Sequence, residues 1–450
     1  MASFVAPPTS FMPEFMTRFQ VGIVFLCICI AGLDGFDVLV VAYTAPAIAR
    51  DWGLTPATIG GLFSAGLAGM GVGALLIAPF GDKIGRRKTV LLSLGILFTG
   101  MLAASFTNNV FELGLVRAFT GLGIGAVLAN VNILVSEYSS PRRRNLCVAL
   151  MSVGYPIGAT IGGIAAVYLL EIWGWRSVYV FGALIALVLV PITLFFLPES
   201  LDFLVARRPG GALARSNRIF ARLGLRQIVA LPPVTQIIPG QRASAFAIFR
   251  PQFLSVTLVT SFLYLSVMAT CYFLLSWTPK LLIDLGLSVR GGISGSLLLN
   301  VGGAIGCILF GLYAVRLGVR RLATGFMLGL VAMTVLFGFI PPVQGLLLTG
   351  AMAVGFCLHT SITVLYVVVP TVFPGAIRAT GTGFAMSIGR VGAVIGPLVA
   401  GLLIQYGYSR SVYCAVLALP MLVAVACLYG LRSLDAPAPT AREPSVAQTA

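Results

Sequence analysis

The chain has 450 residues, of which 58% are hydrophobic and only 9% are charged, and its mean hydropathy is +1.02. Soluble domains carry about 25% charged residues, so this composition excludes a soluble globular protein and indicates one embedded in a membrane. The formal net charge is +16, but 22 of the 29 Lys and Arg lie at the chain ends or in alternate connections between apolar runs. The charge therefore indicates membrane topology and not a nucleic-acid partner.

The first apolar run, 19–48, is too long for a cleavable signal and no small-residue cleavage site follows it, so we expect it to remain as a membrane helix. It contains Asp34 and Asp37, and a carboxylate at the centre of a membrane helix costs about 2.5–3.5 kcal/mol. Three residues correspond to about 300° of helical rotation, which places both carboxylates on one face with Gly35 between them. We predict that the pair couples function to protons; the alternative is a helix contact anchored by hydrogen bonds. The sequence does not rank one Asp above the other.

Twelve windows of about 20 apolar residues predict an all-α integral membrane protein with six helices on each side of a polar, arginine-rich break. We expect an N-terminal segment at 1–18, a six-helix bundle at 19–197, a cytoplasmic linker at 198–250, a second six-helix bundle at 251–432 and a disordered tail at 433–450. The positive-inside rule places both termini in the cytoplasm. The predicted spans are 19–48, 58–80, 89–106, 111–135, 146–170, 178–197, 253–275, 292–315, 322–340, 345–372, 381–404 and 412–431.

An internal repeat relates the two halves of the chain. The sequence DWGL at 51–54 returns as DLGL at 284–287, and KIGRR at 83–87 returns as RLGVR at 316–320, both at an offset of 233 residues. Two parallel, pseudo-symmetric six-helix halves are the architecture of transporters that rock around a central site.

Several motifs point to one family. The segment 79–88 reads PFGDKIGRRK, the first span carries DGFD, the fourth contains RAFTGLGIG at 117–125, and IRATG at 377–381 precedes the eleventh. On these motifs the chain resembles the major facilitator superfamily and, within it, the aromatic acid:proton symporter family. The resemblance implies the major facilitator fold and uptake of a small aromatic carboxylate, such as benzoate, hydroxybenzoate or hydroxyphenylpropionate, with protons. It places the carrier in a bacterial inner membrane, acting as a monomer in the catabolism of aromatic compounds.

Two arginines inside spans are predicted to meet the substrate. At 1.5 Å per residue, Arg117 lies about 9 Å deep and the two Asp roughly 9–14 Å deep, so all three share one level. A carboxylate substrate would compete for Arg117 by a bidentate pair, and the Asp that it frees would favour its protonated form in a low dielectric. Arg390, about 16 Å into its span, is a second candidate for the substrate carboxylate, with a structural pair as the alternative.

Other polar and aromatic residues within the spans have weaker assignments. His359 is the only histidine, and we predict it as a proton relay because imidazole titrates near neutral pH; a neighbouring hydroxyl that satisfies it is the alternative. Tyr272, Trp277 and Tyr366 are predicted to stack on an aromatic ring, with ordinary packing as the alternative.

The resemblance further implies a gate at the cytoplasmic end of the second and third spans. In that reading Asp82 holds the gate closed through charge pairs, together with Arg86 and Arg87, and with Arg378 or Glu137 as participants. The alternative is that these charges only anchor the topology. The second copy of the motif carries Val315 where its acidic residue would fall, so the latch is expected in the first half alone.

Features of an enzyme are missing from the sequence. It has no phosphate-binding loop and no His, Cys and carboxylate cluster with metal-ligand spacing, so we expect neither catalysis nor a cofactor. The eight cysteines lie in or beside apolar spans and are interpreted as packing residues. Two alternatives to uptake remain: a proton-driven exporter of drugs or aromatic compounds, which does not predict the DGFD motif, and a non-transporting ligand sensor, for which the linker and tail leave little room.

Overall fold

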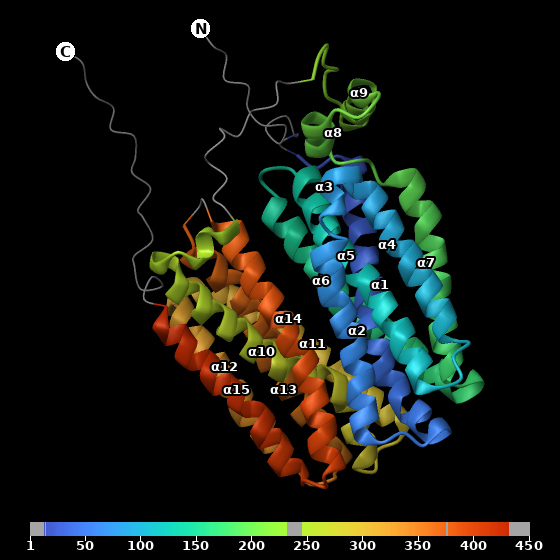
Figure 1. The fold of residues 1–450 in the computed structure, drawn as a ribbon, viewed down its shortest axis with the longest axis vertical. Coiled ribbons are helices and arrows are strands. Elements are labelled where there is room, and N and C mark those ends of the chain that lie inside the picture. The colour runs from blue at the N-terminus through green and yellow to red at the C-terminus, as the bar shows by residue number, and fades with distance from the viewer. Residues whose placement is uncertain (1–12, 14, 232–244, 375–376, 432–450) are drawn as a thin grey trace, which may run out of the picture.

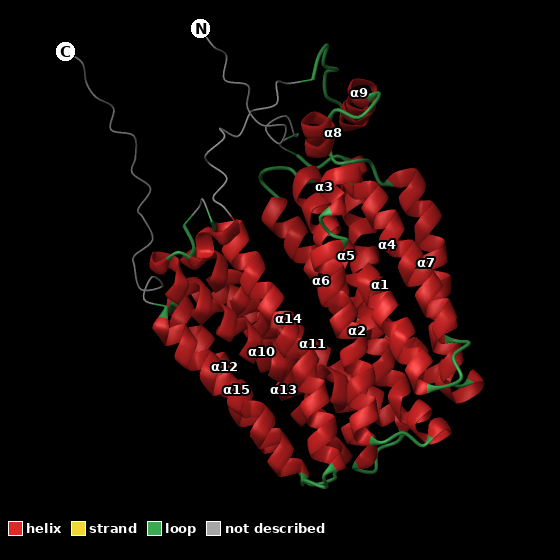
Figure 2. Ribbon diagram, viewed as in Figure 1, coloured by secondary structure: helices red, strands yellow, loops and turns green. Residues whose placement is uncertain are grey.

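The computed structural model describes residues 13, 15–231, 245–374 and 377–431, and within them it contains helices and loops but no β-strand (Figure 2). The predicted tail at 433–450 lies outside the described residues, as does most of the predicted segment at 1–18. Twelve helices in the described part are long and apolar enough to cross a membrane, which confirms the predicted fold class. They are α1 (Arg18–Trp52), α2 (Pro56–Leu76) with its extension α3 (Phe80–Ile84), α4 (Arg86–Ala104), α5 (Val110–Tyr138), α6 (Arg144–Trp173), α7 (Trp175–Phe196), α10 (Pro251–Asp284), α11 (Val289–Leu317), α12 (Val319–Phe337), α13 (Gln344–Val372), α14 (Arg378–Gln405) and α15 (Arg410–Gly430).

The helices form two groups that pack alike. In Figure 1 the blue-to-green helices α1–α7 lie together, and the yellow-to-red helices α10–α15 form the second group. In the first group α1 packs against α6 and α2 against α5; in the second, α10 packs against α14 and α11 against α13. These are equivalent pairs under the internal repeat, so the duplication in sequence is also a duplication in packing.

The repeat also fixes where helices end. Gly53, Gly85 and Gly174 have positive φ angles of 62°, 105° and 74°. The glycines 233 residues later, which are Gly286, Gly318 and Gly407, also have positive φ angles. A residue without a Cβ adopts this backbone region at little cost, so glycine terminates or redirects the chain at matching places in both halves.

The described part of the linker contains helices that the sequence analysis does not predict. Two short helices, α8 (Leu201–Arg207) and α9 (Ala212–Leu223), follow α7, and a 3₁₀ segment, η2 (Ala245–Phe249), precedes α10. Figure 1 shows α8 and α9 beyond one end of the membrane helices. We call this the linker end, and the opposite end, where α1 joins α2 and α14 joins α15, the loop end.

The two halves meet toward the loop end. There α2 packs against α14, α1 against α10 and α6 against α11, whereas the ribbons of the two groups diverge toward the linker end (Figure 1). The Ser64 hydroxyl donates to the Val394 carbonyl at 2.7 Å, and Arg290 lies 3.7 Å from Glu171 across the same seam. A Cβ added at Gly60 would lie 2.7 Å from a carbonyl oxygen of α14, so glycine permits this close approach.

Candidate functional site

A buried ion pair joins α1 to α5. The Arg117 guanidinium donates to one Asp37 carboxylate oxygen at 2.8 Å, to the other at 3.1 Å and to the Asp37 main-chain oxygen at 2.8 Å. Both side chains are almost completely excluded from solvent. The predicted common depth of these two residues is thus matched by direct contact, and the geometry is a bidentate carboxylate pair.

Asp34 does not join that pair, although the sequence places both carboxylates on one helical face. Its side chain is 1% exposed, and among the described residues neither of its carboxylate oxygens accepts a hydrogen bond. It interacts electrostatically with Asp37 on its own helix, with Arg390 on α14 and with Tyr155 on α6. The expectation that one arginine neutralises two carboxylates is therefore wrong for this conformation, because a 60° difference in direction is enough to send the two side chains to different neighbours.

Arg390 lies at the centre of a polar cluster built by both halves. Its guanidinium donates to the Tyr272 hydroxyl at 3.4 Å and to the Met70 sulfur at 3.2 Å, so it reaches from α14 to α10 and across to α2. Tyr366 on α13 interacts electrostatically with Arg390 and Tyr272 and is 52% exposed. The cluster thus combines a cation, hydroxyl groups and an aromatic side chain that remains open to a ligand.

The glycine of the DGFD motif brings α6 close to this cluster. A Cβ on Gly35 would fall within 3 Å of Tyr155 backbone atoms, so α1 and α6 touch through their main chains here. The Tyr155 hydroxyl is buried and has no hydrogen-bond partner among the described residues. Sequence reasoning missed Tyr155, and the signal that points to it is its position within the glycine ridge that contains Gly154 and Gly158.

Trp277 lies apart from the cluster, in the seam between the halves. It is fully buried, its indole nitrogen donates to the Pro397 carbonyl at 3.1 Å, and its ring meets Phe63 edge to face at 5.5 Å. A cavity of about 20 Å³ lined by Phe63, Arg117 and Ser276 lies nearby. That volume holds about one water molecule, so this cavity beside Arg117 has no room for an aromatic acid in this conformation.

His359 contacts α11 of its own half. Its imidazole Nε2 lies 3.2 Å from the Asn300 side-chain oxygen on α11, and its ring packs against Gly303. This placement matches the alternative of a histidine paired with a polar neighbour, although the neighbour is Asn300 and not a hydroxyl on its own helix.

The predicted gate residues gather at the linker end of the first half. The Arg86 guanidinium pairs with the Glu137 carboxylate and lies 3.5 Å from Asp82, whose side chain is 73% exposed. Arg87 binds the Leu194 carbonyl near the end of α7. Each of these contacts lies within one half.

Arg378 is separate from these gate residues. Its Nε donates to the Phe373 carbonyl of its own half at 3.4 Å. Among the described residues, no ion pair therefore links the two halves at the linker end.

Comparison with known proteins places these features in a family context. The model of the Major Facilitator Superfamily matches residues 24–343 and 308–449. A gallate transporter of Pseudomonas putida is 34% identical over 415 residues, which are 91% of this chain and 91% of that protein. The 4-hydroxybenzoate transporter PcaK of Acinetobacter baylyi is 29% identical over 421 residues, 92% of this chain and 91% of that protein. The inward open conformation of the xylose transporter XylE from Escherichia coli matches with a TM-score of 0.69 at 15% identity, covering 90% of this chain and 95% of that one, and shows the fold alone.

Proposed function

This chain belongs to the major facilitator superfamily and is a transporter rather than an enzyme, and from that premise we propose that it imports a small aromatic carboxylate with protons by alternating access. The relatives named for gallate and 4-hydroxybenzoate support an aromatic acid as the substrate. Both of those acids combine a carboxylate with a hydroxylated ring, which is the chemistry that the Arg390 cluster offers to bind.

Arg390 is the proposed partner of the substrate carboxylate. A guanidinium binds a carboxylate by two parallel hydrogen bonds. Among the described residues Arg390 donates to a phenolic oxygen and a thioether sulfur, which are weak partners for a cation. Tyr272 and the half-exposed Tyr366 provide hydroxyl and ring contacts beside it. Arg117, in contrast, already holds a carboxylate in bidentate fashion, so we assign it to the fixed pair with Asp37.

The observation that carries proton coupling is the environment of Asp34. Among the described residues no group donates a hydrogen bond to this buried carboxylate; the neighbouring Asp37 charge disfavours its ionised form, and the Arg390 charge on the opposite half favours it. When a substrate carboxylate binds Arg390, that favourable field is neutralised, and a desolvated carboxylate then favours protonation. Substrate and proton thus bind together, and we rank Asp34 above Asp37 as the proton site.

Direction and topology follow from the charges at the linker end. The arginine-rich segment that contains α8 and α9 lies there, so we propose that this end faces the cytoplasm of a bacterial inner membrane. The loop-end seam is packed, which corresponds to a carrier open toward the cytoplasm. Reorientation would open that seam and bring the linker ends of the halves together, with Asp82 and Arg86 positioned to bias the equilibrium.

The test is proton movement in lightly buffered proteoliposomes on addition of gallate, 4-hydroxybenzoate, benzoate and 3-(3-hydroxyphenyl)propionate. We expect external alkalinisation with one or more acids in the native chain. Asp34→Asn should abolish alkalinisation while binding of the acid persists. Asp284→Asn, which removes a half-exposed carboxylate paired with Lys280, serves as the matched control and should behave as the native chain.

Three outcomes would contradict the proposal. Substrate uptake without proton movement in the native chain would remove proton coupling, and proton movement that survives Asp34→Asn would remove Asp34 as its site. Outward substrate movement driven by an inward proton gradient would establish the exporter instead.

A further inference from the structure

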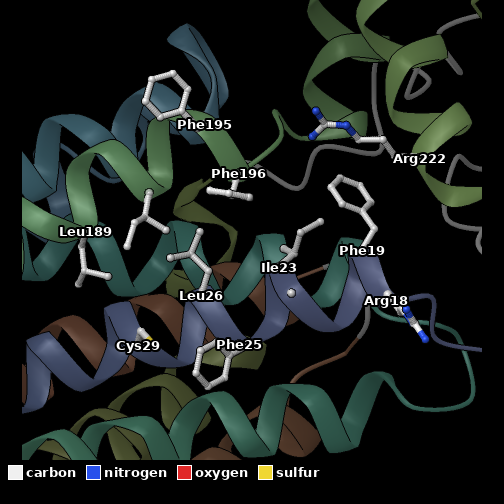
Figure 3. Close-up of a pocket in the computed structure, with 12 residues that line it drawn as sticks. Arg18, Phe19, Ile23, Phe25, Leu26, Cys29, Leu189, Phe195, Phe196 and Arg222 are labelled. Atoms are coloured by element: carbon white, nitrogen blue, oxygen red, sulfur yellow. The ribbon is translucent and has the colours of Figure 1, made fainter.

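A groove opens on the outer surface of the first half, between its first and last membrane helices, α1 and α7. It measures about 550 Å³ and is lined by apolar residues of α1 and α7, including Phe25, Leu26, Leu189 and Phe195 (Figure 3). Phe25 and Phe195 are 66% and 72% exposed, so these rings face the surroundings of the bundle. In a chain whose helices span a bilayer, those surroundings are lipid, and the apolar lining of the groove suits a hydrocarbon chain.

The groove begins at the linker end and runs toward the middle of the membrane. Its α1 wall extends from Arg18 to Cys29, which corresponds to about 16 Å at 1.5 Å per residue. This is roughly half the thickness of a hydrocarbon core of about 30 Å, and therefore the depth of one leaflet. An acyl chain that enters from the linker end would lie along the groove without crossing the bilayer centre.

Two arginines stand at the mouth of the groove (Figure 3). Arg18 is the first residue of α1. The start of that helix is fixed by a capping box in which the Thr17 hydroxyl oxygen accepts from the Gln20 main-chain amide at 3.3 Å. Arg222 belongs to α9, and its guanidinium lies 5.5 Å from the centre of the Phe19 ring. Neither guanidinium forms an ion pair with another described residue.

The orientation of α9 follows from its sequence. Ile219, Phe220 and Leu223 are buried, whereas Arg218 and Arg222 are exposed, so α9 is amphipathic and presents its arginines away from its packed face. The Asn217 side chain donates to the Ile228 carbonyl and accepts from the Ile228 main-chain amide, which holds the chain that follows the helix. The cation at the groove mouth is therefore placed by a folded element of the linker.

We propose that this groove binds an anionic phospholipid of the linker-end leaflet, with the phosphate between Arg18 and Arg222 and one acyl chain along α1 and α7. The charge at the mouth and the apolar wall match the two parts of that molecule, and basic pockets between membrane helices on the cytoplasmic side commonly hold anionic headgroups. A small aromatic acid does not match, because the wall extends far beyond the length of one ring. The bound lipid would connect α9 to the first bundle.

The test measures lipid retained by the purified full chain in native mass spectrometry, with dioleoyl phosphatidylglycerol and dioleoyl phosphatidylcholine as probes of equal chain length. An arginine near an anionic lipid contributes roughly fivefold in affinity, so the native chain should prefer phosphatidylglycerol by about thirtyfold. The double variant Arg18→Gln with Arg222→Gln should lose that preference. Arg218→Gln, one turn away on α9 and outside the groove, is the matched charge control and should keep it.

A second variant fills the groove. A Cβ on Gly22 would have no atom within 4 Å, so Gly22→Trp adds bulk to the groove without a clash and should lower retention of both lipids. Gly95→Trp on α4 is the matched control, since its Cβ would also meet nothing within 4 Å. Unchanged phosphatidylglycerol preference in the double arginine variant, or equal competition by glycerol phosphate without acyl chains, would overturn the proposal. Because Arg18 and Arg222 are exposed, the double arginine variant remains a decisive test even if Gly22→Trp fails to fold.

Discussion

Replacing each carboxylate of the DGFD motif by its amide should have different effects at Asp34 and at Asp37. Arg117 donates three hydrogen bonds to Asp37, two of them to the carboxylate at 2.8 and 3.1 Å. Asp37→Asn keeps the main-chain bond and one side-chain acceptor but leaves a buried guanidinium without its counter-charge. A hydrogen bond to a charged group contributes about 1.5–3 kcal/mol, and breaking a buried pair costs about 3–5 kcal/mol.

Asp34→Asn should behave differently, because the Asp34 carboxylate accepts no hydrogen bond among the described residues. We expect its effect on the free energy of unfolding to stay within about 1 kcal/mol, in the range of substitutions that break no network. The two variants thus form a matched pair in one motif: one loses stability, and the other loses proton movement.

The assay is an unfolding titration in mixed micelles, followed by tryptophan fluorescence, together with a double-mutant cycle. Asp37→Asn should lower the free energy of unfolding by about 3–5 kcal/mol, and adding Arg117→Gln should restore part of the loss, because no unpaired charge then remains. A coupling energy near zero would refute the assignment of this pair to the scaffold. So would a larger loss of stability from Asp34→Asn than from Asp37→Asn.

Two further predictions concern the ends of the carrier. Gly60→Leu should slow transport at least tenfold by opening the loop-end seam. Gly61→Leu should leave the transport rate unchanged, since a Cβ at Gly61 meets nothing within 4 Å. Both effects are measured as uptake rates at equal expression. Glu137→Gln should lower the unfolding midpoint, because its partner Arg86 is largely buried. Asp82→Asn should change the free energy of unfolding by less than about 0.5 kcal/mol, and it should lower the uptake rate more than the affinity for the substrate. Equal thermal effects of the last two variants would contradict this division.

The sequence predicts the fold well because its signals are local. Span length and the internal repeat each depend on short stretches of chain, and the twelve helices of the described residues confirm the predicted spans. The common depth of Asp37 and Arg117, which form a pair in the structure, could also be predicted, since depth along a helix follows from residue counting. The two linker helices were missed, because a polar segment that contains Pro209 and Gly210 reads as loop by composition alone.

The direction of side chains could not be predicted in the same way. Counting residues puts Asp34 beside Asp37, but which neighbouring helix each one meets depends on how α1 packs against α5, α6 and α10. Trp277 shows the same limit: its sequence position suits a ligand, and only the packing of α10 against its neighbours puts its indole nitrogen on the Pro397 carbonyl. Long-range packing decides the site, and that information is distributed over several helices.

The duplicated scaffold carries unequal charges, and this inequality bears on the coupling mechanism. Arg87 and Arg320, which are equivalent in the repeat, both bind carbonyls near the end of the last helix of their half, so the structural cation is present twice. The acidic residues are not: between residues 251 and 431 the only Asp or Glu is Asp284, which lies at the loop end of α10. A carboxylate that carries protons through the membrane must therefore come from the first half, whereas the substrate cation Arg390 comes from the second. In the proposed mechanism the electrostatic interaction between Asp34 and Arg390 crosses the boundary that moves, so rocking of the halves and loading of the substrate act on the same interaction.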